Sequence, residues 1–196
     1  MKKIKISHTD KDTTKQIKKI HTQLNHLYEY THEQQLNIIN NIYQSIIENI
    51  HLHDNKYQYL NETSRFFTRE IKKKLCQYIQ QDKQKEYVHI KREQKDNESE
   101  NDIWFNNKQF YINIKDIIEK IVQQNLLCYY CMEPVFVLYK YRRFNKQWTL
   151  ERLDNSYGHT KTNCVIACLE CNISRNNIIS NEKYKFSKQI NVNKID

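Results

Sequence analysis

Hydrophobic residues recur at helical spacing in three segments of the N-terminal half. These segments span residues 11–30, 36–50 and 67–79. Within each, isoleucine, leucine or an aromatic residue returns every three or four positions, which is typical of one face of an amphipathic helix. Single helices of this kind are marginally stable alone. The pattern therefore predicts three helices that bury their apolar faces on one another.

A polar segment with charges of both signs follows at residues 81–101. Such a composition is typical of a linker or a solvated helix extension, and we place the domain boundary in it. The prediction is a helical region over residues 1–100, a second module over 102–180 and a C-terminal tail over 181–196 that begins with a short helix. Four aromatic residues are expected to pack beneath the second module, with base stacking as the alternative: Trp104, Phe105, Phe110 and Tyr111.

The second module alternates between helix and strand patterns. Residues 112–122 have helical periodicity, and residues 136–144 resemble a strand with a basic end. Residues 148–153 and 164–167 form two further short apolar runs, separated by turn-forming residues around Gly158, the only glycine of the chain. A helix is expected after Cys168. The fold class predicted is α+β, with a strand, loop, strand and helix in this order.

Four of the six cysteines form two Cys-x-x-Cys pairs, Cys128 with Cys131 and Cys168 with Cys171. Two such turns supply the tetrahedral sulfur site that structural Zn²⁺ prefers. Two disulfides are the alternative, but no secretory signal precedes the pairs, which favours metal. Four thiolates leave zinc no open position, so this metal is expected to stabilise the fold and to take no part in catalysis.

Two cysteines, Cys76 and Cys164, fall outside this pairing. Cys76 is expected to be a buried small apolar residue, because no activating partner is visible nearby in the sequence.

The residues between and after the pairs resemble a known family. They are Glu151-Arg152-Leu153-Asp154-Asn155, Gly158-His159-Thr160, Asn163-Cys164-Val165 and Cys168-Leu169-Glu170-Cys171-Asn172. Their order and spacing are similar to the HNH, or His-Me finger, endonucleases, in particular a phage and giant-virus branch with two Cys-x-x-Cys pairs. The resemblance covers residues 110–180 and implies a zinc-clamped ββα-metal module. It also implies hydrolysis of DNA phosphodiester bonds.

The resemblance assigns a role to each matching position. Glu151 and Asn172 match the residues that bind the catalytic divalent ion, and their oxygen atoms suit Mg²⁺ or Mn²⁺. Asn163 matches an asparagine that holds the loop through backbone hydrogen bonds. Cys164 resembles a position that is commonly Cys or Val in the family, so it is also expected to be buried. Asp154 is a further candidate ligand of the catalytic ion, ranked below Glu151 and Asn172.

Arg152 departs from the family pattern, which has a histidine there as the general base. Arginine does not give up its proton in proteins, so it does not serve as a base, although its planar fork suits two phosphate oxygens. Three alternatives stay open. His159 supplies the base, the metal ionises the water unaided, or the site is inactive.

The formal net charge of +9 at pH 7 favours a polyanionic partner. Double-stranded DNA is the partner expected, with contacts from basic residues near the motif: Lys140, Arg142, Arg143, Lys146 and Arg175. The other interpretation of the basic strand end is a charged edge that discourages aggregation. No apolar run is long enough to span a bilayer, and the start of the chain has no signal core. We expect a soluble intracellular protein of the cytoplasm or nucleus, with a virus-infected cell as one possible setting.

The sequence thus predicts an enzyme, a metal-dependent HNH-type endonuclease. The alternative is a catalytically inactive, zinc-stabilised module that binds nucleic acid.

Overall fold

The computed structural model describes residues 25–50, 57–96, 111–176 and 180–190. Its elements follow one another as η1 (Asn25–Glu29), α2 (His32–Glu48), α3 (Glu62–Asp96), α4 (Ile114–Gln123), β1 (Trp148–Arg152), β2 (Cys164–Cys168), α5 (Leu169–Arg175) and α6 (Asn181–Gln189). The predicted α+β class is confirmed, with a helical N-terminal region and a small antiparallel sheet. None of the described helices is both long and apolar enough to cross a membrane.

The second and third predicted helices are confirmed as α2 and α3. Ile39, Ile42 and Ile46 form the buried face of α2. Thr31 and Gln34 begin this helix with a capping box, in which each side chain bonds the other's backbone N–H. Residues 11–24 of the first predicted helix lie outside the described residues, and residues 25–29 form the 3₁₀ helix η1.

The α3 helix extends into the polar segment, which agrees with the interpretation of residues 81–96 as a helix extension and not as a linker. Phe67, Ile71 and Leu75 are buried on it, as the apolar pattern predicts. The helix then continues through the polar segment as far as Asp96. The rest of that segment, together with Trp104, Phe105 and Phe110, lies outside the described residues.

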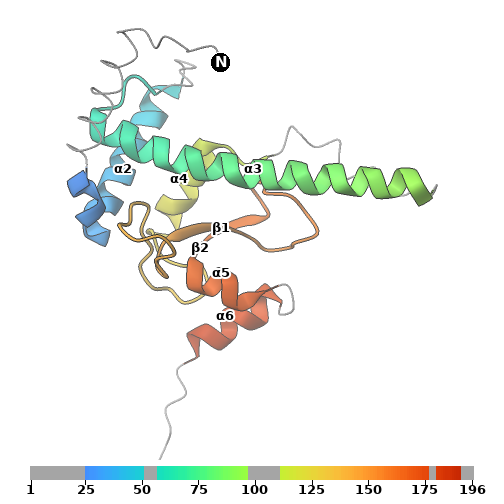
Figure 1. Cartoon of the computed structure of the whole chain (residues 1–196). Helices are drawn as coiled ribbons and strands as arrows, with labels where there is room; N and C mark the ends of the chain where they lie inside the picture. Colours follow the sequence, from blue (N-terminus) through green and yellow to red (C-terminus); the bar gives the residue numbers. More distant parts are fainter. Residues whose placement is uncertain (1–24, 51–56, 97–110, 177–179, 191–196) are drawn as a thin grey trace, which may run out of the picture.

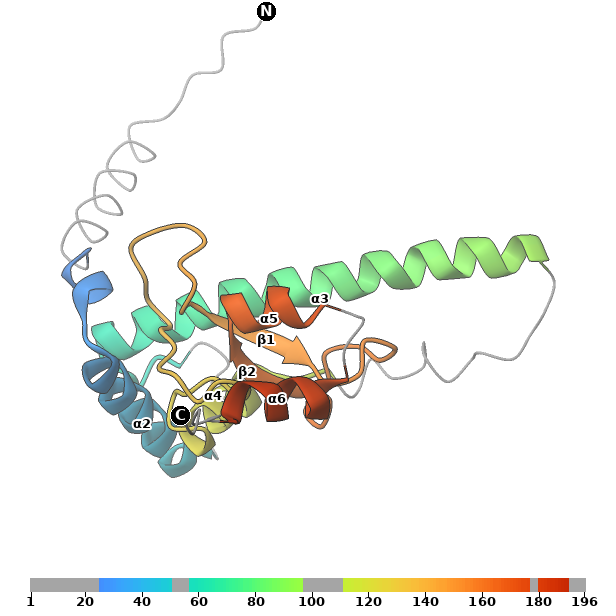
Figure 2. The same cartoon turned by 90° about the horizontal axis from the view of Figure 1, so that it is seen from below.

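The predicted order of strand, loop, strand and helix is confirmed. β1 pairs with β2 in antiparallel register, with Glu151 opposite Val165, and α5 begins directly after β2. The helix predicted over residues 112–122 is α4, and the short helix of the C-terminal segment is α6. Figure 1 shows α3 running along one side of the sheet, with α5 and α6 on the other. The view from below in Figure 2 places α5 and α6 in front of the strands.

The long helix α3 holds β1 through polar side chains at four-residue spacing. Lys74 Nζ donates to the Trp148 carbonyl oxygen, and Tyr78 Oη accepts from the Leu150 backbone N–H at 3.2 Å. Residues four apart share one helix face. β1 is therefore bonded to β2 along one edge and to side chains of α3 along the other, and the buried apolar residues of the helices and the sheet form one core cluster.

The prediction of a strand over residues 136–144 is wrong. Only an isolated bridge between Phe136 and Gln147 forms there, and bends and turns follow. The buried side chain of Gln35 explains the difference, because its Oε1 accepts from the backbone N–H groups of Val137 and Leu138 at 3.0 Å each. Its Nε2 donates to the Leu138 carbonyl oxygen at 3.0 Å. These backbone groups are therefore bonded to α2 and not to a partner strand.

The two unpaired cysteines differ. Cys164 is buried on β2, as predicted, but Cys76 is exposed on α3, so its prediction is wrong. Cys76 follows the buried Leu75 and points away from the apolar face of the helix.

We expect Gln35→Ala to lower the free energy of unfolding by about 2 to 4 kcal/mol, because it leaves buried backbone groups without partners. Chemical denaturation measures this loss. The matched control is Gln44→Ala, an exposed position of the same helix, which should change stability by less than about 0.5 kcal/mol. Equal effects of the two substitutions would show that the Gln35 bonds contribute little.

Candidate functional site

Four cysteine side chains converge at one end of the sheet. The sulfur atoms of Cys128, Cys131, Cys168 and Cys171 all lie within 4.8 Å of one another, and the Cys131 and Cys168 sulfurs are 4.0 Å apart. Sulfurs bound to a single zinc at about 2.3 Å lie about 3.8 Å apart in a tetrahedron. All four are free cysteines without disulfides. The group could hold a metal ion and is compatible with structural zinc.

Local backbone geometry brings the sulfurs together. Cys168 ends β2 and caps α5, where its sulfur accepts from the Cys171 backbone N–H at 3.3 Å. The Cys128 sulfur accepts from the Cys168 backbone N–H at the same distance. Hydrogen bonds from the Cys168 and Cys171 thiols lower the pKa of Cys128. Backbone N–H groups and neighbouring thiols thus favour negative charge on this sulfur, which is the form that binds metal.

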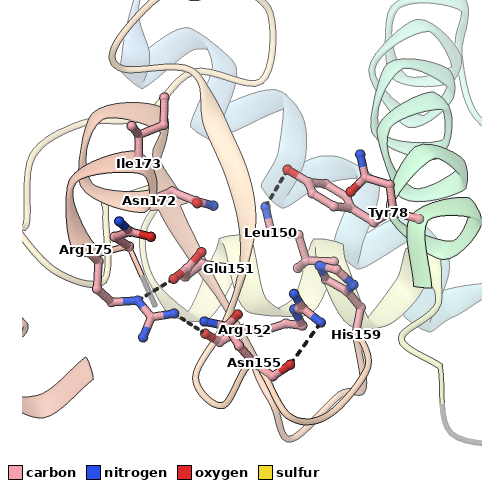
Figure 3. A pocket seen from close by; sticks show the side chains of 11 residues that line it. Tyr78, Leu150, Glu151, Arg152, Asn155, His159, Asn172, Ile173 and Arg175 are labelled. Atoms are coloured by element: carbon pink, nitrogen blue, oxygen red, sulfur yellow. Dashed lines mark hydrogen bonds and ion pairs between the residues drawn. The ribbon is translucent and has the colours of Figure 1, made fainter. Parts of the chain in front are cut away.

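A separate open pocket of about 290 Å³ lies between α3, β1 and α5. Figure 3 shows the side chains that surround it. Its lining comprises Tyr78, Gln81, Leu150, Glu151, Arg152, Asn155, His159, Asn172, Ile173, Arg175 and Asn176. Of the predicted site residues, the pocket thus brings together Glu151, Arg152, His159, Asn172 and Arg175. Asn163 and Asp154 are not part of its lining.

Glu151 lies on β1 and forms a buried ion pair with Arg175 of α5. Arg175 Nε donates to Glu151 Oε1 at 2.6 Å, and Arg175 also donates to the Arg152 carbonyl oxygen at 3.0 Å. Burial raises the pKa of Glu151, and the positive charge of Arg175 offsets the rise only in part. The guanidinium of Arg175, which we predict to contact nucleic acid, is thus engaged with Glu151 inside the protein.

Asn172 reaches the same pocket from the first turns of α5. Its Nδ2 donates to Thr149 Oγ1 at 3.1 Å. This bond fixes the amide, and it leaves the Oδ1 atom as the one available to a ligand. A carboxylate from the strand and an amide oxygen from the helix therefore border one cavity.

Asn163 ties the loop between the strands into a fixed shape. Its Oδ1 accepts from the Asp154 backbone N–H at 2.9 Å. Its Nδ2 donates to the carbonyl oxygens of Asp154 and Gly158, at 2.8 and 3.1 Å. The Asp154 carboxylate caps its own turn by accepting from the Ser156 backbone N–H at 2.7 Å.

Arg152 holds the same loop from the strand. Its Nη1 donates to the Tyr157 carbonyl oxygen at 3.1 Å and to that of Asn155 at 3.5 Å. It also lies 3.8 Å from an oxygen of Asp82. The guanidinium thus brings positive charge to the pocket, and these three contacts with protein groups hold it in place.

His159 is buried and paired with Asp82 of α3. The Asp82 Oδ2 atom lies 2.8 Å from His159 Nδ1 and also accepts from the His159 backbone N–H at 2.8 Å. Burial alone would raise the pKa of Asp82, but these hydrogen bonds outweigh it and the pKa is lowered. The Tyr78 ring stacks beside the imidazole, with centroids 4.9 Å apart, and burial raises the pKa of Tyr78 to about 12. His159 therefore has an ionised partner on one side and a neutral phenol on the other.

Sequence reasoning did not find Asp82 or Tyr78 as members of this site. A signal was present, because Leu75, Tyr78 and Asp82 recur at three- and four-residue spacing. That spacing continues the buried face of α3 into the polar segment. Asp82 is the next residue on this buried face, and a buried carboxylate needs a hydrogen-bonding or charged partner.

The remaining predicted nucleic-acid contacts lie on the loop before β1. Lys140, Arg142 and Arg143 are exposed, and Lys146 is half-buried. Lys140 and Lys146 lie 3.7 Å from Glu29 and Glu170 respectively. None of the four borders the pocket.

Comparison of the chain with protein-family models, curated proteins and solved structures found no match. The functional argument therefore depends on the pocket and on the motif residues that surround it.

We expect the purified protein to contain about one zinc ion per chain and to lose thermal stability when a strong chelator removes it, because metal binding contributes to folding free energy. Elemental analysis and thermal denaturation measure these quantities. Cys171→Ser should abolish stoichiometric metal, whereas Cys76→Ser, at an exposed cysteine outside the cluster, should keep it. Full metal content in both variants would contradict the assignment of the four cysteines as a zinc site.

Proposed function

We propose that this protein is a metal-dependent endonuclease of the HNH type that hydrolyses DNA phosphodiester bonds. One observation supports this most strongly. Glu151 of β1 and Asn172 of α5 border one pocket together with Arg152 and His159, at the positions that the motif resemblance gives to the active site. This convergence results from the pairing of β1 with β2 and from the start of α5 directly after Cys168.

The pocket offers oxygen ligands for a hard cation. The Glu151 carboxylate and the Asn172 Oδ1 atom are the groups that would hold Mg²⁺ or Mn²⁺. When bound, such an ion stabilises negative charge on the phosphoryl group and on the departing oxygen. Glu151 keeps a second oxygen besides the one that Arg175 binds, so a cation and Arg175 share one carboxylate in this proposal.

The protein supplies the remaining positive charge and the proton acceptor. Arg152 and Arg175 place two guanidinium groups beside the pocket, where charge develops on the phosphate in the transition state. Water attacks phosphorus as the bond from phosphorus to the 3′ oxygen breaks. Its proton goes to His159 or, in the other alternative, to a base in solution, and a metal ion held by Glu151 and Asn172 would favour the second route by making the water more acidic.

We expect Glu151→Gln and Asn172→Ala each to reduce nicking of supercoiled DNA in Mg²⁺ or Mn²⁺ by about 100-fold or more. Glu151→Gln removes the negative charge and one carboxylate oxygen, and Asn172→Ala removes the amide oxygen. A plasmid cleavage time course with a metal series measures the rates. The matched control is Glu170→Gln, which changes an exposed carboxylate two positions from Asn172 on the same helix. Its rate should equal that of the wild type.

Wild-type protein that leaves supercoiled, linear and single-stranded DNA uncut with every metal would overturn the proposal. Cleavage by Glu151→Gln at the wild-type rate would overturn the metal site alone.

The alternative function is a catalytically inactive module that binds nucleic acid. The ion pair between Glu151 and Arg175 favours it, because a carboxylate that is already neutralised attracts a cation less strongly. This alternative predicts salt-sensitive binding of DNA without cleavage.

Both functions predict that the exposed loop before β1 contacts the phosphate backbone. We expect Arg142→Ala/Arg143→Ala to weaken binding to duplex DNA about equally for all sequences and to reduce the salt dependence of the binding constant, because fewer counterions are released. Fluorescence anisotropy at several salt concentrations measures both effects. The control Lys183→Ala/Lys188→Ala removes two charges from α6 and should change binding less. An equal loss in both double variants would show that only net charge matters.

A further inference from the structure

Asp82 contacts the loop that carries His159 from a distant part of the chain. It lies 77 positions before His159 and is 6% exposed on α3. Its Oδ2 atom binds both the backbone N–H and the ring of His159, and its Oδ1 atom lies 3.8 Å from Arg152 Nη1. A buried carboxylate with these three contacts fixes the histidine relative to the long helix.

The only glycine of the chain makes this approach possible. A Cβ atom at Gly158 would lie 3.3 Å from Asp82 Oδ2 and 3.2 Å from the Tyr111 ring. Contacts of this length are tighter than most side chains tolerate, so a glycine here lets α3 and the loop come together.

The contact also determines which ring nitrogen of His159 carries the proton. An ionised carboxylate only accepts hydrogen bonds, so Nδ1 donates to Asp82. In the neutral imidazole, Nε2 then has a free lone pair. It has no hydrogen-bond partner among the residues that the structure describes, and the ring borders the pocket that also contains Glu151 and Asn172.

We propose that Asp82 is a positioning residue that keeps His159 protonated on Nδ1, so that Nε2 accepts the proton of the attacking water. This inference rests on the proposed nuclease function and selects His159 over metal-ionised water as the base. Nε2 takes the proton as the water oxygen bonds to phosphorus. The phosphorus bond to the 3′ oxygen breaks, and this oxygen leaves with a proton from solvent. Asp82 stays ionised and stabilises the imidazolium that forms.

Several charged or titratable groups contact the imidazole or line the same pocket. They are Asp82 and Tyr78 from α3, Glu151 and Arg152 from β1, and Arg175 from α5. Burial raises the pKa of Tyr78 to about 12, so its phenol stays neutral across neutral pH. A base no longer accepts a proton once it is protonated, so cleavage should slow toward low pH, and the raised pKa of Glu151 contributes to the same fall.

The test combines nitrogen NMR of His159 with cleavage rates between pH 5 and 9 for wild type and Asp82→Asn. We expect the wild-type spectrum to place the proton on Nδ1. In Asp82→Asn the amide oxygen can still accept from the His159 backbone N–H, but the negative charge that favours the Nδ1 proton and the imidazolium is lost. The Nδ1 tautomer should therefore lose population, and cleavage should fall by about 100-fold or more with a changed pH profile. Glu70→Gln, a carboxylate change on the same helix outside this pocket, should keep the wild-type tautomer, rate and pH profile.

Two results would overturn the inference: a wild-type proton on Nε2, or an Asp82→Asn enzyme with unchanged rate and pH profile. The wild-type spectrum needs no variant, so it remains decisive if Asp82→Asn does not fold. A wild-type protein that shows the Nδ1 proton but cuts no DNA would refute the proposed nuclease, and with it the catalytic use of His159, while leaving the Asp82 contact established.

Discussion

The pairing of two five-residue strands is the constraint on which the pocket depends. A two-stranded sheet is marginal by itself in water, because it buries little apolar surface. Here Cys168 belongs to the sheet, caps α5 and contributes a sulfur to the four-cysteine group. A metal ion held by these sulfurs would join the turn at Cys128, the end of β2 and the start of α5. Glu151 and Asn172 face one cavity only while these parts stay together.

The second support of the sheet is α3, which takes the place of a third strand. Lys74, Tyr78 and Asp82 lie on one face of the helix at successive turns, and each bonds a backbone group of β1 or of the loop after it. Burial lowers the pKa of Lys74 to about 7, and the ammonium lies over the Trp148 ring at 4.9 Å from its centroid. Side chains of a helix therefore satisfy backbone groups that a neighbouring strand would otherwise bond.

The pocket gathers buried charges, which are costly unless they are paired. Glu151 pairs with Arg175, and Asp82 contacts both His159 and Arg152. Pairs of this kind give little net stability compared with apolar packing, because desolvation offsets the attraction. Removal of one partner, however, leaves an uncompensated buried charge. A concentration of such pairs around an open cavity is typical of functional sites, and this agrees with the role proposed for the pocket.

The sequence by itself determined the helices α2 and α4, the order of β1, β2 and α5, and the four cysteines that gather at the end of the sheet. These features are local, because periodicity, turn residues and the Cys-x-x-Cys spacing act within a few residues. Only the tertiary structure decided that residues 136–144 form no strand, since Gln35 binds their backbone from a hundred positions away. It likewise decided that Asp82 meets His159 and that Arg175 faces Glu151. Each of these contacts depends on how α3 and α5 pack against β1. The local spacing of residues indicates that Asp82 continues a buried helix face, but it does not show which distant residue Asp82 meets.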